Sequence, residues 1–380
     1  MILTVTIDGI NVLTTLIDFG IATLIYIMVA LTVNLEFGYT GVPNFGKVLF
    51  VASGGLIAGS LSYYLMGYIL EIKSSDIIGN QFQFHNLMDS ALNGHPALDF
   101  ALFLFMIVVG AVVGGLLGFL ASYPAIRLRE DYLGMLLLAA GEFFLIFVQA
   151  YYPITGGTAG LLTPDILGFT GSQPQYREVV LLGILAAFTT GIYLYVERVA
   201  RSPLGRTLRA VRDNEMSSEA LGKDTVAIRR NILIVGSALS GIAGVLVVVE
   251  SAYISPTTFV RTFYTFYPFV IVILGGAANN FGVVVGAITF EGIITTINNI
   301  QTYAPAHNIT IPIDLNAVTP IAIGVLLIVV LLWRPKGLIS EKPTLTLNRS
   351  VLAKIRETAK KESEGQTLEK DPRSFPSEEH

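Results

Sequence analysis

The hydrophobic pattern of the chain consists of long apolar runs separated by short polar stretches. Several runs approach the ~20 residues that an α-helix needs to cross a bilayer. The candidate spans are residues 13–33, 45–70, 98–122, 131–152, 176–196, 231–249, 264–274, 281–297 and 316–333. Two of them, 264–274 and 281–297, are short for a complete crossing. We therefore expect an all-α, polytopic membrane protein with about eight to ten transmembrane helices, some of them short or broken.

The strongest polar interruption is the stretch 197–230, which separates two long apolar runs. Its eight basic side chains are Arg198, Arg201, Arg206, Arg209, Arg212, Lys223, Arg229 and Arg230. Short basic loops of membrane proteins stay in the cytoplasm. Most of the 24 Lys and Arg residues lie in this loop, at 127–129, or from Arg334 onward. We expect these three regions in the cytoplasm and the N-terminus outside the cell.

The central loop also carries the signals of folded helices. Ser202 precedes Pro203, a pair typical of a helix start, and Asn214 is placed to cap a second short helix. The first helix has an apolar face: Leu204, Leu208 and Val211. Gly222 is placed to end the second helix in a left-handed conformation. The loop is either a solvated connector that fixes orientation or a docking surface for a cytoplasmic partner, and two capped helices favour docking.

Two glycine-rich stretches interrupt the apolar pattern, at residues 34–46 and 275–282. Backbone groups that Pro and Gly release at membrane depth must be satisfied by protein or water. Transporters build substrate paths from such broken helices. We therefore expect the solute path to follow 41–47 and 275–282. Its candidate residues are Gly41, Asn44, Gly46, Lys47, Gly275, Gly276 and Gly282.

Ionisable residues within the apolar runs are functional candidates by default. Asp18 lies near the outer end of its run, where an interfacial position is expected. For Lys47 we favour a side chain that reaches water at the interface over one that contacts an anionic group of the solute. Glu142 is included in the candidate path, although a hydrogen-bonding role between helices is the simpler interpretation. Glu291 is a second intramembrane acid.

Other glycines in the chain predict packing and turns. Gly110, Gly114 and Gly118 recur every fourth residue, a spacing that lets helices approach closely. The run 155–161 lacks the Lys-Ser/Thr pair and the strand context of a phosphate-binding loop, so it predicts a turn. Residues 340–380 are highly charged with few aromatics and predict a disordered tail with one short helix near 352–361.

Composition excludes several classes of function. With 53% hydrophobic and 14% charged residues, the chain is too apolar for an ordinary soluble domain. The first basic residue is Lys47, so a cleaved signal peptide is not expected. The absence of cysteine excludes disulfides and thiolate chemistry. The four histidines are scattered, and no nucleotide motif or catalytic constellation is present. We expect a transport subunit and no enzyme, without cofactor, metal or nucleic acid.

Several separated motifs carry a resemblance to a known family. The stretch RSPLGRTLRAVRDNEMSSEALG resembles the cytoplasmic loop of branched-chain amino acid ABC transporter permeases. The stretch RLREDYLGMLLLAAGEF, the Thr-Gly-Gly-x-x-Gly-Leu run at 155–161, the Leu-Gly-Gly at 274–276 and the Arg-Pro-Lys-Gly-Leu at 334–338 are also similar to that family. The resemblance covers roughly 34–338. At 42–47 the chain departs from the family's usual Gln-x-Ser-x-Gly-His.

The resemblance implies the membrane subunit of an ATP-driven importer of branched-chain amino acids. Its expected partners are ABC ATPase subunits, a second related permease subunit, an extracytoplasmic solute-binding protein and the lipid bilayer. The run 219–222 stands where import permeases carry their coupling motif. The residues expected to couple to the ATPase are Arg206, Arg209, Glu219, Ala220 and Gly222. Residues 1–338 would form the permease domain, with 197–230 as its coupling loop, and 339–380 a cytoplasmic tail.

Two alternative functions stay open at this point. An importer of urea or short amides belongs to the same superfamily. An ion-coupled secondary transporter belongs to a different class, and it has no need of a capped helix pair that faces a partner. The central loop therefore favours the ATP-driven importer.

Overall fold

The structure is a computed structural model that describes residues 6–7, 10–71, 79–92, 94–128, 130–168, 174–306 and 315–341. The chain divides into two units, Met1–Glu341 and Lys342–His380. All described residues belong to the first unit. The expected tail helix near 352–361 lies outside them.

The described chain is almost entirely helical. Its α-helices are α1 (Val12–Val33), α2 (Lys47–Ile69), α3 (Gln81–Leu92), α4 (Pro96–Arg127), α5 (Glu130–Ala150), α6 (Tyr152–Thr155), α7 (Pro174–Arg201), α8 (Pro203–Asp213), α9 (Glu215–Ala220), α10 (Thr225–Ser251), α11 (Tyr267–Gly275), α12 (Asn280–Ala306) and α13 (Leu315–Trp333). Two π-helices extend this set: η1 (Asn34–Gly38) and η5 (Thr262–Phe266). Short 3₁₀ turns lie at η2 (Gly157–Ala159) and η4 (Pro256–Thr258).

Within the described residues, seven helices are long and apolar enough to cross a membrane. They are α1 continued through η1, α2, α4, α5, α7, α10 and α12. Two shorter apolar helices are Thr262–Gly275, which joins η5 to α11, and Val318–Trp333 within α13. The predicted fold class, an all-α polytopic membrane protein with some short helices, is confirmed.

The core forms where α2, α4 and α10 pack together, and these pairs make the most extensive contacts in the chain. Small residues bring the backbones close. A Cβ on Gly244 would overlap the carbonyl oxygen of Val51, and one on Gly114 would overlap the carbonyl of Ser237. The predicted packing role of Gly114 and its neighbours at four-residue spacing is therefore confirmed.

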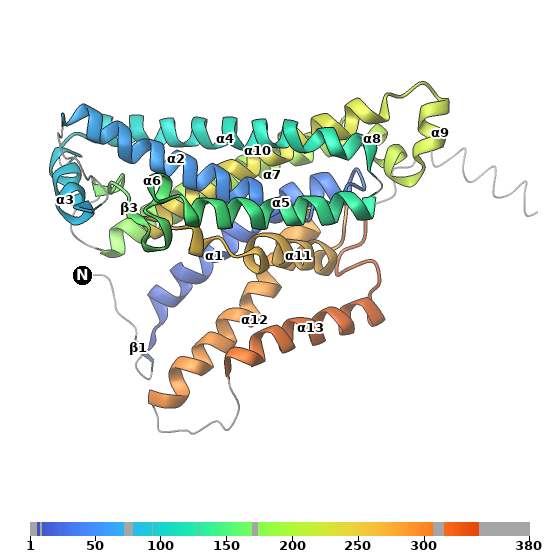
Figure 1. Ribbon diagram of the computed structural model, residues 1–380. Coiled ribbons are helices and arrows are strands. Elements are labelled where there is room, and N and C mark those ends of the chain that lie inside the picture. The colour runs from blue at the N-terminus through green and yellow to red at the C-terminus, as the bar shows by residue number, and fades with distance from the viewer. Residues whose placement is uncertain are drawn as a thin grey trace, which may run out of the picture. The chain divides into compact units, whose positions relative to one another are not determined.

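The two ends of the helical bundle differ. One end carries α3, α6 and a two-stranded ribbon, and the opposite end carries α8 and α9 (Figure 1). In the ribbon, β3 (Leu161–Leu162) pairs antiparallel with β4 (Tyr253–Ile254). The predicted turn at 155–161 leads into β3 and contains three glycines with positive φ: Gly156, Gly157 and Gly160. A second ribbon, β1 (Thr6–Ile7) with β2 (Ile10–Asn11), precedes α1.

Candidate functional site

The central loop folds as the two capped helices that the sequence predicts. The Ser202 hydroxyl accepts from the Gly205 N–H at 3.4 Å at the start of α8. The Asn214 side chain accepts from the Ser217 N–H at 2.9 Å at the start of α9. Gly222 follows α9 with φ +75°, a left-handed conformation in which glycine is unstrained. The loop is thus a defined surface at one end of the bundle (Figure 1).

The outward face of this helix pair combines apolar and charged side chains. Met216 and Leu221 are 81% and 80% exposed. Leu208 and Val211 are buried, as the predicted apolar face requires, whereas Leu204 on the same predicted face is exposed. An apolar surface between charged residues is typical of a site that binds another protein.

The five predicted coupling residues are not all on that face. Four are exposed: Arg206, Glu219, Ala220 and Gly222. Arg209 turns inward, where its Nε lies 2.8 Å from Glu341 Oε1 and its guanidinium lies 5.1 Å from the centre of the Tyr39 ring. Arg209 therefore joins the loop to the membrane helices rather than presenting its charge outward.

Arg212 makes the most direct link between α8 and the end of the first membrane helix. Its Nη1 donates to the Gly38 carbonyl at 2.7 Å, and its Nη2 lies 3.0 Å from Glu341 Oε2. Burial lowers the pKa of Arg212, but hydrogen bonds and charges of Asp213 and Glu341 outweigh it, and the pKa is raised. Nothing in the sequence pattern identified Glu341, because it lies at the start of a charged tail.

The second glycine-rich break packs against the segment that follows α13. The N–H groups of Leu338 and Ile339 donate to the carbonyls of Leu274 and Gly275 at 2.8 and 3.0 Å. Gly276 has φ +114°, and a Cβ there would overlap the Ile339 carbonyl oxygen. In this structure the glycines of the break permit close backbone contact, and their place along a solute path stays a prediction.

The first break encloses a buried ion pair. The Lys47 Nζ lies 2.7 Å from Glu36 Oε1, and the two side chains are 0% and 1% exposed. The Asn44 side chain donates to the other Glu36 oxygen at 2.9 Å. The interpretation of Lys47 as a side chain that reaches water was wrong, because η1 and the turn that follows it place Glu36 directly opposite the start of α2.

Asn34 and Asn280 connect the two breaks to each other. The Asn34 side chain donates to Asn280 Oδ1 at 2.9 Å and accepts from the Ala278 N–H at 2.8 Å. Asn280 donates in turn to Glu197 Oε2 near the end of α7, at 2.7 Å. Both breaks therefore lie at the end of the bundle that carries α8. Asn34, Glu36 and Glu197 were not singled out by the sequence, since their partners lie far away along the chain.

Other predicted path residues lie in different surroundings. Gly41 has φ +79° and packs beside Arg212. Gly46 packs against α5, where a Cβ would lie 2.7 Å from the Leu137 Cβ. Glu142 is half-exposed, and its Oε2 lies 3.5 Å from Arg261 Nη1. Neither of the two cavities described below is lined by the predicted path residues.

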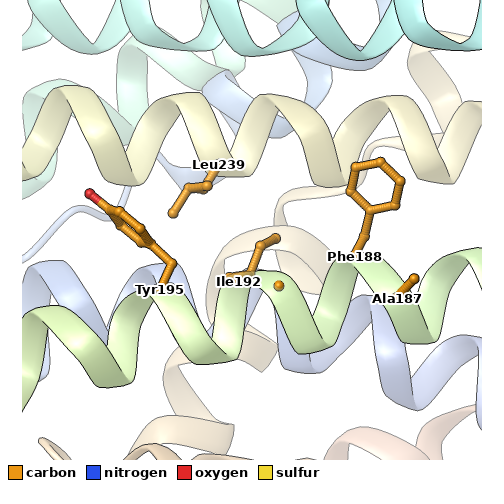
Figure 2. A pocket seen from close by; sticks show the side chains of 6 residues that line it. Ala187, Phe188, Ile192, Tyr195 and Leu239 are labelled. Atoms are coloured by element: carbon orange, nitrogen blue, oxygen red, sulfur yellow. The ribbon is translucent and has the colours of Figure 1, made fainter.

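Two cavities of the described chain are lined by residues outside both glycine-rich breaks. A groove of about 430 Å³ between α7 and α10 has an almost wholly apolar wall (Figure 2). Its lining is Ala187, Phe188, Gly191, Ile192, Tyr195 and Leu239. A second cavity of about 320 Å³ lies against α1 and includes the carboxylates of Asp18 and Glu250 in its wall. The apolar groove offers little to a charged solute, since such a ligand needs polar partners.

Comparison with known proteins agrees with the arrangement of helices and loop. The chain matches the family described as "Branched-chain amino acid transport system / permease component" over residues 15–331. The probable branched-chain amino acid transport permease protein LivM of Methanocaldococcus jannaschii is 34% identical over 322 residues, 85% of this chain and 92% of that protein.

Two bacterial relatives are more distant. The high-affinity branched-chain amino acid transport system permease proteins LivM of Salmonella typhimurium and Escherichia coli are each 25% identical over 355 residues, 87% of this chain and 72% of theirs. No solved structure matches the chain significantly. The family match spans the seven long helices and the loop between α7 and α10. This multi-pass membrane protein therefore belongs to the branched-chain amino acid transport permease family.

Proposed function

We propose that the protein is the membrane subunit of an ATP-driven importer of branched-chain amino acids. The relatives are named as permeases for these solutes, which favours them over urea or short amides. The pair α8–α9 would dock with cytoplasmic ATPase subunits. An extracytoplasmic binding protein would deliver the solute at the opposite end, beside α3 and the β3–β4 ribbon, and a second permease subunit would complete the path.

The observation that carries this proposal is the double attachment of α8. Through Arg212 it binds the carbonyl of Gly38 at the end of η1, and through Glu341 it binds the segment paired with Gly275. A movement of α8 imposed by an ATPase would therefore act on both helix breaks at once. An ion-coupled secondary transporter has no need of such a surface, so this attachment favours the importer.

A glycine pair offers a test of docking. Gly222 has φ +75° and Gly94, which precedes α4 at the opposite end, has φ +88°; a Cβ at either position meets nothing within 4 Å. Valine at either site would strain the backbone to a similar degree without a clash in the subunit. We expect Gly222→Val to reduce co-purification of the ATPase subunits and amino acid uptake at least about tenfold, a loss of ~1.4 kcal/mol of coupling.

The matched variant Gly94→Val should keep normal co-purification of the ATPase subunits, because it imposes the same kind of strain at the opposite end of the bundle from α8 and α9. Glu219→Lys reverses an exposed charge beside Gly222 and should also weaken ATPase recruitment. Normal recruitment and uptake in both Gly222→Val and Glu219→Lys would contradict a coupling role for α9.

A further inference from the structure

An ion pair between Glu142 in α5 and Arg261 at the start of η5 lies at an unusual depth for two charged side chains. Glu142 lies close to the middle of the span Tyr132–Ala150. The Arg261 Nη1 lies 3.5 Å from Glu142 Oε2, so its guanidinium is at the same depth. The pair therefore places both signs of charge near the centre of the membrane.

Both members of the pair are accessible on the surface of this subunit. The Glu142 side chain is 45% exposed and that of Arg261 is 40% exposed. Charges at the centre of a bilayer are costly and almost always face a protein interior or a water-filled cavity. This surface of α5 therefore does not face lipid, and a water-filled path is the environment that suits both charges.

The side chains of Glu142 and Arg261 are free to form hydrogen bonds with a ligand. Within the part of the chain that the structure describes, the side chains of Glu142 and Arg261 contact each other but make no hydrogen bond. Their 3.5 Å separation is longer than the ~2.7–2.9 Å of a charge-assisted hydrogen bond. The carboxylate can still accept and the guanidinium can still donate to a ligand.

Arg261 lies at the start of a continuous helix, in which the π-helix η5 leads directly into α11. Arg261 immediately precedes the π-helix η5, and wide π-turns occur frequently at functional sites. The Thr265 hydroxyl accepts from the Val48 N–H at 3.0 Å, which fixes η5 against α2. Exposed aromatic side chains lie close to each charge along the chain: Phe143, 71% exposed, follows Glu142, and Phe263, 42% exposed, lies two positions after Arg261.

We propose that Glu142 and Arg261 bind the α-amino acid as a zwitterion during its passage. The Glu142 carboxylate accepts from the ammonium group, and the Arg261 guanidinium donates to the carboxylate. Phe143 and Phe263 contact the aliphatic side chain of the solute. Charges are balanced with and without solute, because the two residues pair with each other when the site is empty. This inference rests on the proposed function, since it assigns an amino acid as the ligand.

Uptake of leucine by the full transporter in proteoliposomes tests the site. The variants are Glu142→Gln and Arg261→Gln, each assembled with the partner subunits and supplied with saturating binding protein. Loss of a hydrogen bond to a charged group predicts a fall in uptake of about tenfold to a hundredfold. Co-purification with the ATPase subunits should persist in both variants.

A matched control exists in the pair Arg177–Asp165. Its separation is 3.4 Å and its side chains are 33% and 32% exposed, so it is comparable in geometry but lies at the start of α7. Because the binding protein is saturating, a weaker contact at this end of the bundle is compensated, and Arg177→Gln should leave the maximal rate of leucine uptake unchanged. An equal fall in uptake for Arg177→Gln would overturn the assignment of the effect to the site at Glu142.

The exchange variant Glu142→Arg/Arg261→Glu separates binding from structure. It restores the ion pair with reversed geometry, so assembly should be normal and uptake should stay low. Normal uptake in the exchange variant, or in both single variants, would overturn the site while leaving the proposed function intact. Absence of leucine uptake by the unsubstituted transporter would instead contradict the proposed function.

Discussion

Two intramembrane ion pairs in this permease differ in almost every physical property. Glu36 and Lys47 lie 2.7 Å apart and are 1% and 0% exposed, with Asn44 as a further partner. Glu142 and Arg261 lie 3.5 Å apart and are 45% and 40% exposed, and their side chains make no hydrogen bond among the described residues. One pair is complete within the subunit, and the other still has capacity for a ligand.

The difference shows how depth in the protein changes the role of a charge. In a fully buried ion pair both charged groups lose their hydration. The attraction between them offsets that loss only when the geometry is good and further hydrogen bonds are present. Glu36 and Lys47 meet both conditions, and they fix the turn on which Arg212 docks. A half-exposed pair contributes little to stability. The residues of the second pair are therefore freer to bind solute.

Removing one partner of the buried pair gives the largest effect we expect. Lys47→Met leaves the Glu36 carboxylate without its cation in a site closed to water. Breaking such a pair costs about 3–5 kcal/mol. The expected result is a large fall in the thermal unfolding midpoint of the purified permease, and in the yield of folded protein.

The double variant Glu36→Gln/Lys47→Met tests whether the unpaired Glu36 charge causes the loss of stability. It removes both charges and keeps similar side-chain volumes, so it should be more stable than Lys47→Met alone. A double variant as unstable as the sum of the two single variants would show that the charges do not act as a pair.

Close packing around Glu36 gives an intermediate effect. Gly236 in α10 has no side chain where the Glu36 carboxylate lies, and a Cβ there would overlap Oε1. Gly236→Ala should displace the carboxylate from Lys47 and destabilise the permease by about 1–3 kcal/mol. Gly183→Ala in α7 is the control, because its Cβ meets nothing within 4 Å. In that helix alanine should be neutral or slightly stabilising, and equal thermal midpoints for the two variants would contradict the packing argument.

Local patterns were sufficient for the parts of the structure that local physics determines. The caps at Ser202 and Asn214, the left-handed Gly222 and the close packing of Gly114 all follow from residue type and spacing. Apolar run lengths likewise predicted the membrane class. The caps and the left-handed glycine depend on interactions within a few residues of one helix end. Close packing depends only on a small residue at the contact face of the helix.

Long-range partners could not be predicted in the same way. Lys47 was misinterpreted because its neighbours along the chain do not reveal that η1 presents Glu36 to it. Glu341 lies 129 positions from Arg212, at the start of a segment whose composition predicts disorder. Arg261 lies far from Glu142 along the chain, and only the fold brings the two side chains together. Each partner depends on a turn or a helix end whose direction the sequence does not specify.

The smallest effect we expect concerns the stability of the exposed pair. Arg261→Gln removes a contact of 3.5 Å between side chains that are 40% and 45% exposed on the surface of the subunit. Exposed ion pairs contribute about 0–1 kcal/mol, so the thermal midpoint should change far less than in Lys47→Met. When both variants are purified and measured in the same way, the thermal midpoint of Lys47→Met should lie clearly below that of Arg261→Gln. A loss of stability in Arg261→Gln as large as that in Lys47→Met would mean that this pair also holds the fold together, and the open hydrogen-bonding capacity of Glu142 and Arg261 would no longer point to a ligand.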